Sequence, residues 1–150
     1  MTNPSVRIAL SLPPTVNHCY RNAPVPTRNK TTGKTGVRMC RVLTSEAETW
    51  MQAAGYVAKA ALKKAGWVMP EAGKKVVVEL RVAWPDNRRR DMNNLHKLTA
   101  DVLEHIAYVD DRYALLRDMD YRVDPKHPAL HLTVFALESP PTSPEKGNTP

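Results

Sequence analysis

Apolar residues alternate with other residues along four short stretches of this chain, and a period of two residues is typical of a half-buried β-strand. The stretches cover residues 6–12, 76–84, 113–123 and 130–136. Pro85 follows the second stretch directly, and proline is rarely tolerated inside a sheet because it lacks a backbone N–H. The chain is therefore predicted to fold around a β-sheet.

Two segments between these stretches have helical spacing instead. Residues 45–65 contain an apolar stripe made of Trp50, Met51, Ala54, Val57, Ala58, Ala61 and Leu62. Ser45 and Glu48 have the spacing of a capping box, in which two side chains bond to free backbone N–H groups. A second helix is predicted over residues 91–106, with Asp91 as its cap.

The order of these elements predicts an α+β domain. We expect a mixed or antiparallel sheet of about four strands, with two main helices packed on it. The domain should cover residues 1–138, and residues 139–150 form a Pro-rich tail that cannot bury apolar surface and is expected to be disordered. Residues 21–43 are rich in Pro, Gly, Thr and Lys and are predicted to be a flexible basic loop, with a short strand near residues 37–42.

Length and composition exclude several classes of protein. The 150 residues, 42% of them hydrophobic, fit one globular domain. No apolar run approaches the ~20 residues that cross a membrane, and the N-terminus lacks a signal-peptide pattern. Cys19 and Cys40 are too few for a disulfide scaffold. We therefore expect a cytoplasmic protein with reduced thiols and no membrane partner.

The chain has a net charge of +7, and its cations are clustered. Six basic residues with no acid between them are Arg21, Arg28, Lys30, Lys34, Arg38 and Arg41, and a second cluster is Arg88, Arg89 and Arg90. Such clusters attract polyanions, of which nucleic acid is the commonest. A solvated basic face that only aids solubility explains the charge alone equally well.

The second basic cluster belongs to the stretch NRRRDMNNLHK, residues 87–97, at the predicted corner between a strand and a helix. Asp91 lies at the start of the helix, where free N–H groups favour a carboxylate. Asn93 and Lys97 are four residues apart and share one helix face. Taken alone, the stretch is explained more simply by a capped helix beside a solvated loop.

A second acidic element, Asp110 and Asp111, precedes the third predicted strand. If the strands at 76–84 and 113–123 are neighbours, these residues can meet Asp91 at one edge of the sheet. Converging carboxylates repel one another unless they are protonated or bridged by a cation. Mg²⁺ prefers oxygen ligands and binds through a few carboxylates, waters and substrate phosphate. Together with the cations, this predicts a phosphodiester substrate.

At these positions the sequence resembles the RusA family of Holliday junction resolvases, over residues 6–137. The pattern RRRD-x-[DN]-N-L-x-K covers Arg88, Arg89, Arg90, Asp91, Asn93, Asn94, Leu95 and Lys97. The pattern PP-[ST]-x-N-x-x-Y covers Pro13, Pro14, Thr15, Asn17 and Tyr20. Asp110 and Asp111 follow at the family's spacing.

The resemblance implies a RusA-like fold and a homodimer that binds four-way or other branched DNA and nicks two strands symmetrically, using Mg²⁺ or Mn²⁺. It implies a role in recombination, repair or phage DNA processing, in the bacterial cytoplasm. The implied catalytic residues are Asp91, Asn93, Asp111 and Lys97, and the implied metal ligands are Asp91, Asn93, Asp110 and Asp111. Contacts to DNA are expected from Arg88, Arg89, Arg90, Lys97, Asn17, Tyr20, Arg21, Lys30, Lys34 and Arg38.

Asn93 departs from the family pattern, which usually has an aspartate there. An amide oxygen can bind a hard cation but contributes no charge. Three alternatives stay open: weaker metal binding with activity retained, a protein that binds junctions without cutting them, or an engineered change. A nucleic-acid-binding module unrelated to resolvases is a further alternative. The GKTG at residues 33–36 lacks full phosphate-loop spacing, so no nucleotide cofactor is expected.

Overall fold

A computed structural model describes residues 2–138, and the predicted Pro-rich tail therefore lies outside the described residues. Within this range no helix is both long enough and apolar enough to cross a membrane. The elements are β1 (Val6–Leu10), α1 (Val16–Cys19), β2 (Tyr20–Arg28), β3 (Thr35–Leu43), α2 (Ser45–Lys64), β4 (Val76–Trp84), η1 (Met92–Leu95), α3 (His96–Leu103), η2 (Asp111–Tyr113), β5 (Ala114–Val123) and β6 (Ala129–Ala136).

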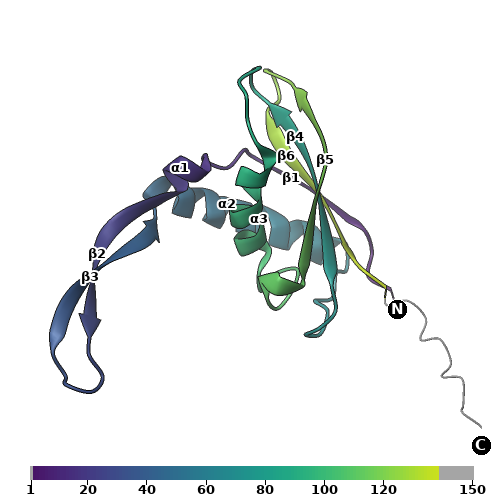
Figure 1. Ribbon diagram of the computed structural model, residues 1–150. Coiled ribbons are helices and arrows are strands. Elements are labelled where there is room, and N and C mark those ends of the chain that lie inside the picture. The colour runs from purple at the N-terminus through teal and green to yellow at the C-terminus, as the bar shows by residue number, and fades with distance from the viewer. Residues whose placement is uncertain (1, 139–150) are drawn as a thin grey trace, which may run out of the picture.

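The main sheet has four strands in the order β1-β6-β4-β5. β6 pairs antiparallel with both β1 and β4, whereas β4 and β5 are parallel. The predicted α+β class and the four-stranded mixed sheet are thus confirmed. α2 and α3 contact one another and lie to one side of the sheet (Figure 1).

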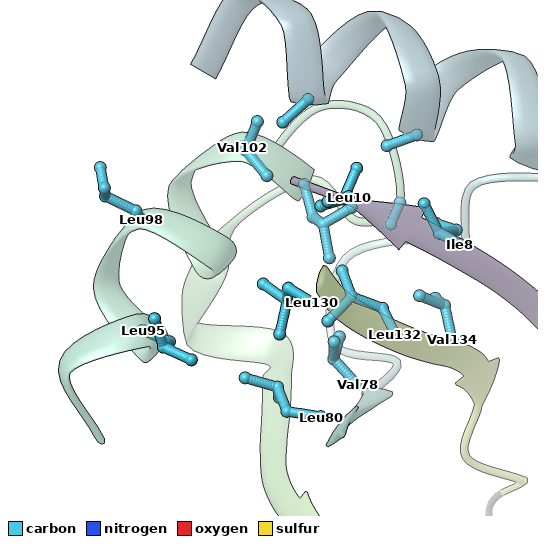
Figure 2. Packing of buried hydrophobic residues seen from close by; sticks show 14 of the residues in the cluster. Ile8, Leu10, Val78, Leu80, Leu95, Leu98, Val102, Leu130, Leu132 and Val134 are labelled. Carbon is cyan, nitrogen blue, oxygen red and sulfur yellow. The ribbon is translucent and has the colours of Figure 1, made fainter. Parts of the chain in front are cut away.

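The hydrophobic core lies between the sheet and these two helices (Figure 2). The strands contribute the buried side chains Ile8, Leu10, Val78, Leu80, Leu130, Leu132 and Val134, and η1 with α3 contributes Leu95, Leu98 and Val102. Burying each aliphatic side chain of this size stabilises the fold by about 1.5–3 kcal/mol. The core therefore fixes α3 on the sheet, and with it the polar side chains on the outer face of that helix.

Both predicted helices are present, with different ends. α2 is capped by Thr44 rather than Ser45, because the Thr44 hydroxyl accepts a hydrogen bond from the Ala47 N–H at 3.3 Å. The Asp91 cap is confirmed, since its carboxylate accepts from the Asn93 N–H at 2.9 Å. The second helix begins as the 3₁₀ turn η1 and ends at Leu103, short of the predicted end.

The predicted flexible loop at residues 21–43 is instead a regular β-hairpin. β2 and β3 pair antiparallel along their whole length and form a separate two-stranded sheet. The Asn29 side chain accepts from the Thr31 N–H at 2.8 Å and so closes the connecting turn. The hairpin projects away from the main sheet (Figure 1). The short strand predicted near residues 37–42 is confirmed as part of β3. The rest of the loop prediction was wrong because two prolines in β2 and the polar residues around them conceal the strand pattern.

Candidate active site

The sheet topology corrects the expected meeting of Asp91 with the second acidic element. β4 and β5 are neighbours, but they are parallel, with Val76 paired to Ala114 and Trp84 paired to Val123. The end of β4 and the start of β5 therefore lie at opposite ends of the two parallel strands. The sheet does not bring Asp91 to Asp111 within one chain.

Instead, η1 and α3 lie beside the sheet and lead from the end of β4 back toward the start of β5 (Figure 1). Asp91 precedes η1, and Glu104 follows α3 as its C-cap. The two helical elements contain 4 and 8 residues, so they span roughly 18 Å at about 1.5 Å per residue. Two groups of functional residues consequently stand at the two ends of this segment.

At the far end of α3, three carboxylates gather. One oxygen from each of Glu104, Asp110 and Asp111 lies within 4.8 Å of the others. The Asp111 N–H donates to Glu104 Oε1 at 3.4 Å, and the Asp110 carboxylate accepts from the Arg112 N–H at 3.0 Å. We call these three residues the acidic cluster. The structure brings together two of the predicted ligands, and Asp91 does not belong to the cluster.

Sequence reasoning missed Glu104. It enters the cluster because the chain turns sharply after α3, where His105 has a φ of 62° and its N–H donates to the Tyr108 carbonyl at 2.7 Å. The buried Tyr108 hydroxyl donates to the Ala100 carbonyl at 2.8 Å and holds this turn against the helix. The available signal was its spacing from Lys97, because residues seven apart share one helix face.

A polar row along α3 leads from the acidic cluster toward the hairpin. Lys97 Nζ donates to Asp101 Oδ1 at 2.9 Å, and Glu104 lies one turn further on. The hydrogen bond that Lys97 donates to Asp101 raises the pKa of Lys97, and the charge of Asp111 acts in the same direction. Lys97 is thus a protonated ammonium group within electrostatic reach of the cluster.

Tyr20 stands where the hairpin meets this row. Burial raises the pKa of Tyr20, and the charge of Asp101 raises it further while Lys97 opposes the shift. The Arg41 guanidinium lies over the Tyr20 ring, 4.7 Å from its centroid. The structure therefore places Tyr20, a predicted DNA contact, beside the predicted active-site lysine.

At the other end of α3, a cleft of about 820 Å³ joins two of the sequence motifs. Thr15 and Asn17 of the N-terminal motif line it together with Arg89, Arg90 and Asp91. Asp91 and Asn93 are exposed, so their side chains are accessible to a ligand. The two motifs that are far apart in sequence thus form one surface.

The three arginines before Asp91 are not equivalent. Arg90 donates to Asp86 at 2.6 Å and lies over the Trp84 ring, 5.1 Å from its centroid. The hydrogen bond from Arg90 lowers the pKa of Asp86 to about 2. Arg88 is 84% exposed, and Arg89 is also exposed. Arg90 is therefore a fixed part of the corner, whereas Arg89 and Arg88 are exposed, Arg88 with its Nε 3.8 Å from Asp86 Oδ2.

His96, at the start of α3, is paired with an acid on the sheet. Its Nε2 lies 2.7 Å from Asp118 Oδ1 on the edge strand β5. The contact joins the start of α3 to the sheet, and His96 directly precedes Lys97. It helps to fix the orientation of the polar row.

The fold and the site together describe a small α+β domain with a carboxylate cluster, a nearby lysine and exposed arginines. A family model described as endodeoxyribonuclease RusA matches residues 22–134. This range covers more than half of the 150-residue chain, and the chain therefore belongs to the RusA endodeoxyribonuclease family. The resemblance seen in the sequence motifs is thereby confirmed. None of the curated proteins that were compared matches the chain.

Proposed function

We propose that this protein is a metal-dependent endonuclease that resolves four-way DNA junctions by paired symmetric nicks. The observation that carries the proposal is the acidic cluster within electrostatic reach of protonated Lys97. Family membership supports cleavage of DNA. The exposed cations of the hairpin and of Arg88–Arg89 supply the charge that a DNA backbone requires.

The donor set of the cluster fits a hard divalent cation. Glu104, Asp110 and Asp111 offer carboxylate oxygens only, which suit Mg²⁺ or Mn²⁺ rather than a softer metal. Because the three side chains are partly exposed, room remains for water and a phosphate oxygen. When bound, such an ion lowers the pKa of a water nucleophile and offsets charge on the phosphate.

The protein's own residues then position the scissile phosphate. Lys97 donates hydrogen bonds to a phosphate oxygen and stabilises the charge that develops during attack. Asp101 holds the Lys97 ammonium group at 2.9 Å and so keeps it oriented toward the cluster. Arg88 and Arg89 contact the flanking backbone, and Asn17 and Tyr20 contact the nucleotides beside it.

The proposed roles of Asp91 and Asn93 as ligands of the same ion require a second copy of the chain. Within one chain, η1 and α3 separate Asp91 from the acidic cluster by roughly 18 Å. A two-fold dimer can place the Asp91 end of one protomer against the cluster of its partner. This arrangement also gives two sites, one for each incision.

A second candidate function is junction binding without cleavage, which Asn93 favours because its side chain brings no negative charge. One assay separates the two functions. A labelled mobile four-way junction is incubated with Mg²⁺ or Mn²⁺ and with the wild type, Asp111→Asn or Asn93→Asp, while Glu71→Gln serves as an acidic control outside the cluster.

Paired nicks by the wild type and by Glu71→Gln that need metal and disappear in Asp111→Asn are the expected result. Tight junction binding without nicks, with cleavage appearing only in Asn93→Asp, would favour the binding protein. Equal affinity for linear duplex and junction would contradict both and support a general nucleic-acid-binding module.

A further inference from the structure

The β2–β3 hairpin carries more than charge. Its six cations, Arg21, Arg28, Lys30, Lys34, Arg38 and Arg41, are all exposed, and among the described residues none of them forms a salt bridge. No acid lies between Tyr20 and Leu43 to neutralise them. The hairpin thus carries a local excess of positive charge away from the body of the domain (Figure 1).

The same hairpin also exposes a row of apolar side chains. Pro24 pairs with Met39 and Pro26 pairs with Val37, and directly opposite residues share one face of an antiparallel ribbon. Val37 is 72% exposed and Met39 is 64% exposed, and both prolines are exposed too. We call these four residues the apolar row. Exposed apolar side chains grouped in this way indicate a surface that becomes covered by a partner.

The apolar row lies on the same face as the residues nearest the active site. Residues two apart in a strand point to the same face, so Tyr20 and Asn22 of β2 lie on the face of the apolar row, and so does Arg41 of β3. Arg41 stacks on Tyr20, and Tyr20 lies close enough to Asp101 and Lys97 for their charges to act on it, so this face lies next to the polar row of α3. A DNA strand bound at the acidic cluster would therefore meet the apolar row next.

The prolines make a second protein strand an unfavourable partner. Both residues lack a backbone N–H, and in a paired strand a proline is tolerated where its N side points away from the ladder. The outer edge of β2 has consequently lost two donors that another chain would need. Charge complementarity and this blocked edge favour DNA over a second copy.

Resting on the proposed function, we propose that the hairpin lies along a duplex arm of the substrate with its apolar row in the minor groove. A two-stranded β-ribbon can enter either groove of a DNA duplex. The row offers no hydrogen-bonding groups for base edges in the major groove, whereas apolar wedges of Pro and Met side chains are known to enter the minor groove. Flanking arginines and lysines contact the phosphates on either side.

The test compares two matched double variants of the full chain. Val37→Ser with Met39→Ser removes half of the apolar row. Val68→Ser with Met69→Ser removes the same residue types where they are also exposed, after α2 and outside the hairpin. Binding is measured without metal on four-way junctions whose arms are about 20 or about 6 base pairs long. The hairpin strands are about 30 Å long, which corresponds to about nine base pairs.

The hairpin variant should bind the long-armed junction roughly tenfold more weakly. Its affinity for the short-armed junction and the slope of affinity against salt should be unchanged, because no phosphate contact is lost. Netropsin, which occupies A·T-rich minor grooves, should compete with the wild type but hardly with the hairpin variant. The control variant should match the wild type throughout.

Equal binding of both variants to the long-armed junction would overturn the inference while leaving the nuclease proposal intact. A hairpin variant that sediments as a smaller species than the wild type would also overturn it, in favour of a second copy as the partner. A wild type that fails to bind any junction would overturn the proposed function itself.

Discussion

Replacing Glu104 with Gln should make the metal-free protein more stable and should abolish its stabilisation by Mg²⁺. Glu104 faces two carboxylates within 4.8 Å, and two unit charges at that distance repel by about 0.9 kcal/mol in water-like surroundings. The relief from two such neighbours is therefore about 2 kcal/mol without salt, and salt screening reduces it to about 1 kcal/mol. Gln keeps an oxygen that can accept from the Asp111 N–H.

The stabilisation of the wild type by Mg²⁺ should be larger than the stabilisation of the metal-free protein by Glu104→Gln. A ligand at 100 times its Kd stabilises the folded state by about 2.7 kcal/mol. At about 2–4 °C per kcal/mol for a chain of this length, the wild-type Tm should rise by roughly 5–10 °C. Glu104→Gln should begin about 2–4 °C above the wild type and gain little from Mg²⁺.

The assay is thermal unfolding followed by circular dichroism, with and without Mg²⁺, and with Ca²⁺ as a second divalent ion. Glu71→Gln removes an exposed carboxylate that does not belong to the acidic cluster and should behave as the wild type does. A Glu104→Gln protein with the full wild-type response to Mg²⁺ would refute the assignment of the acidic cluster as the metal site.

Three further predictions concern the cap, the arginine corner and the dimer. Thr44→Ala should lower the free energy of unfolding by about 1 kcal/mol, whereas Ser45→Ala should change it by less than about 0.5 kcal/mol. Denaturant unfolding measures both values, and a larger loss in Ser45→Ala would show that Ser45 is the cap. The lowered pKa of Asp86 means that its contribution to stability is complete above pH 3.8 and is lost as the pH falls through about 2. Acid unfolding of Asp86→Asn should consequently be flatter between pH 4 and 2, and identical curves would argue against the Arg90 pairing. Mixing Asp91→Asn with Asp111→Asn should restore single nicks if the sites are shared between protomers, and an inactive mixture of proven heterodimers would contradict that sharing.

The main sheet and α2 could be predicted because burial imposes a period on their sequences. Val76 to Trp84 alternate in the sequence and form β4, whose side chains Val78 and Leu80 reach the core. The hairpin could not be predicted in this way, because its strands pair only with each other and bury almost nothing. Pro24 and Pro26 also break the strand pattern that its backbone adopts.

The motifs indicated which residues matter, but not which of them meet. Placing Asp91 beside Asp111 assumed only that β4 and β5 are neighbours, and the parallel direction of the pair reverses the result. A strand, a helix and a second strand in sequence order favour a parallel crossover, so the direction was available from the chain itself. The place of Glu104 in the acidic cluster depends on the turn at His105, and no periodic pattern in the sequence predicts that turn.

The most direct test of the account is the location of Mn²⁺ by anomalous diffraction from crystals of this protein grown with the ion. The account predicts a peak within about 2.5 Å of carboxylate oxygens from Glu104, Asp110 or Asp111. It further predicts that any additional protein ligand comes from the Asp91 end of a second protomer. A fully occupied peak elsewhere, with the acidic cluster empty, would contradict the assignment of the active site.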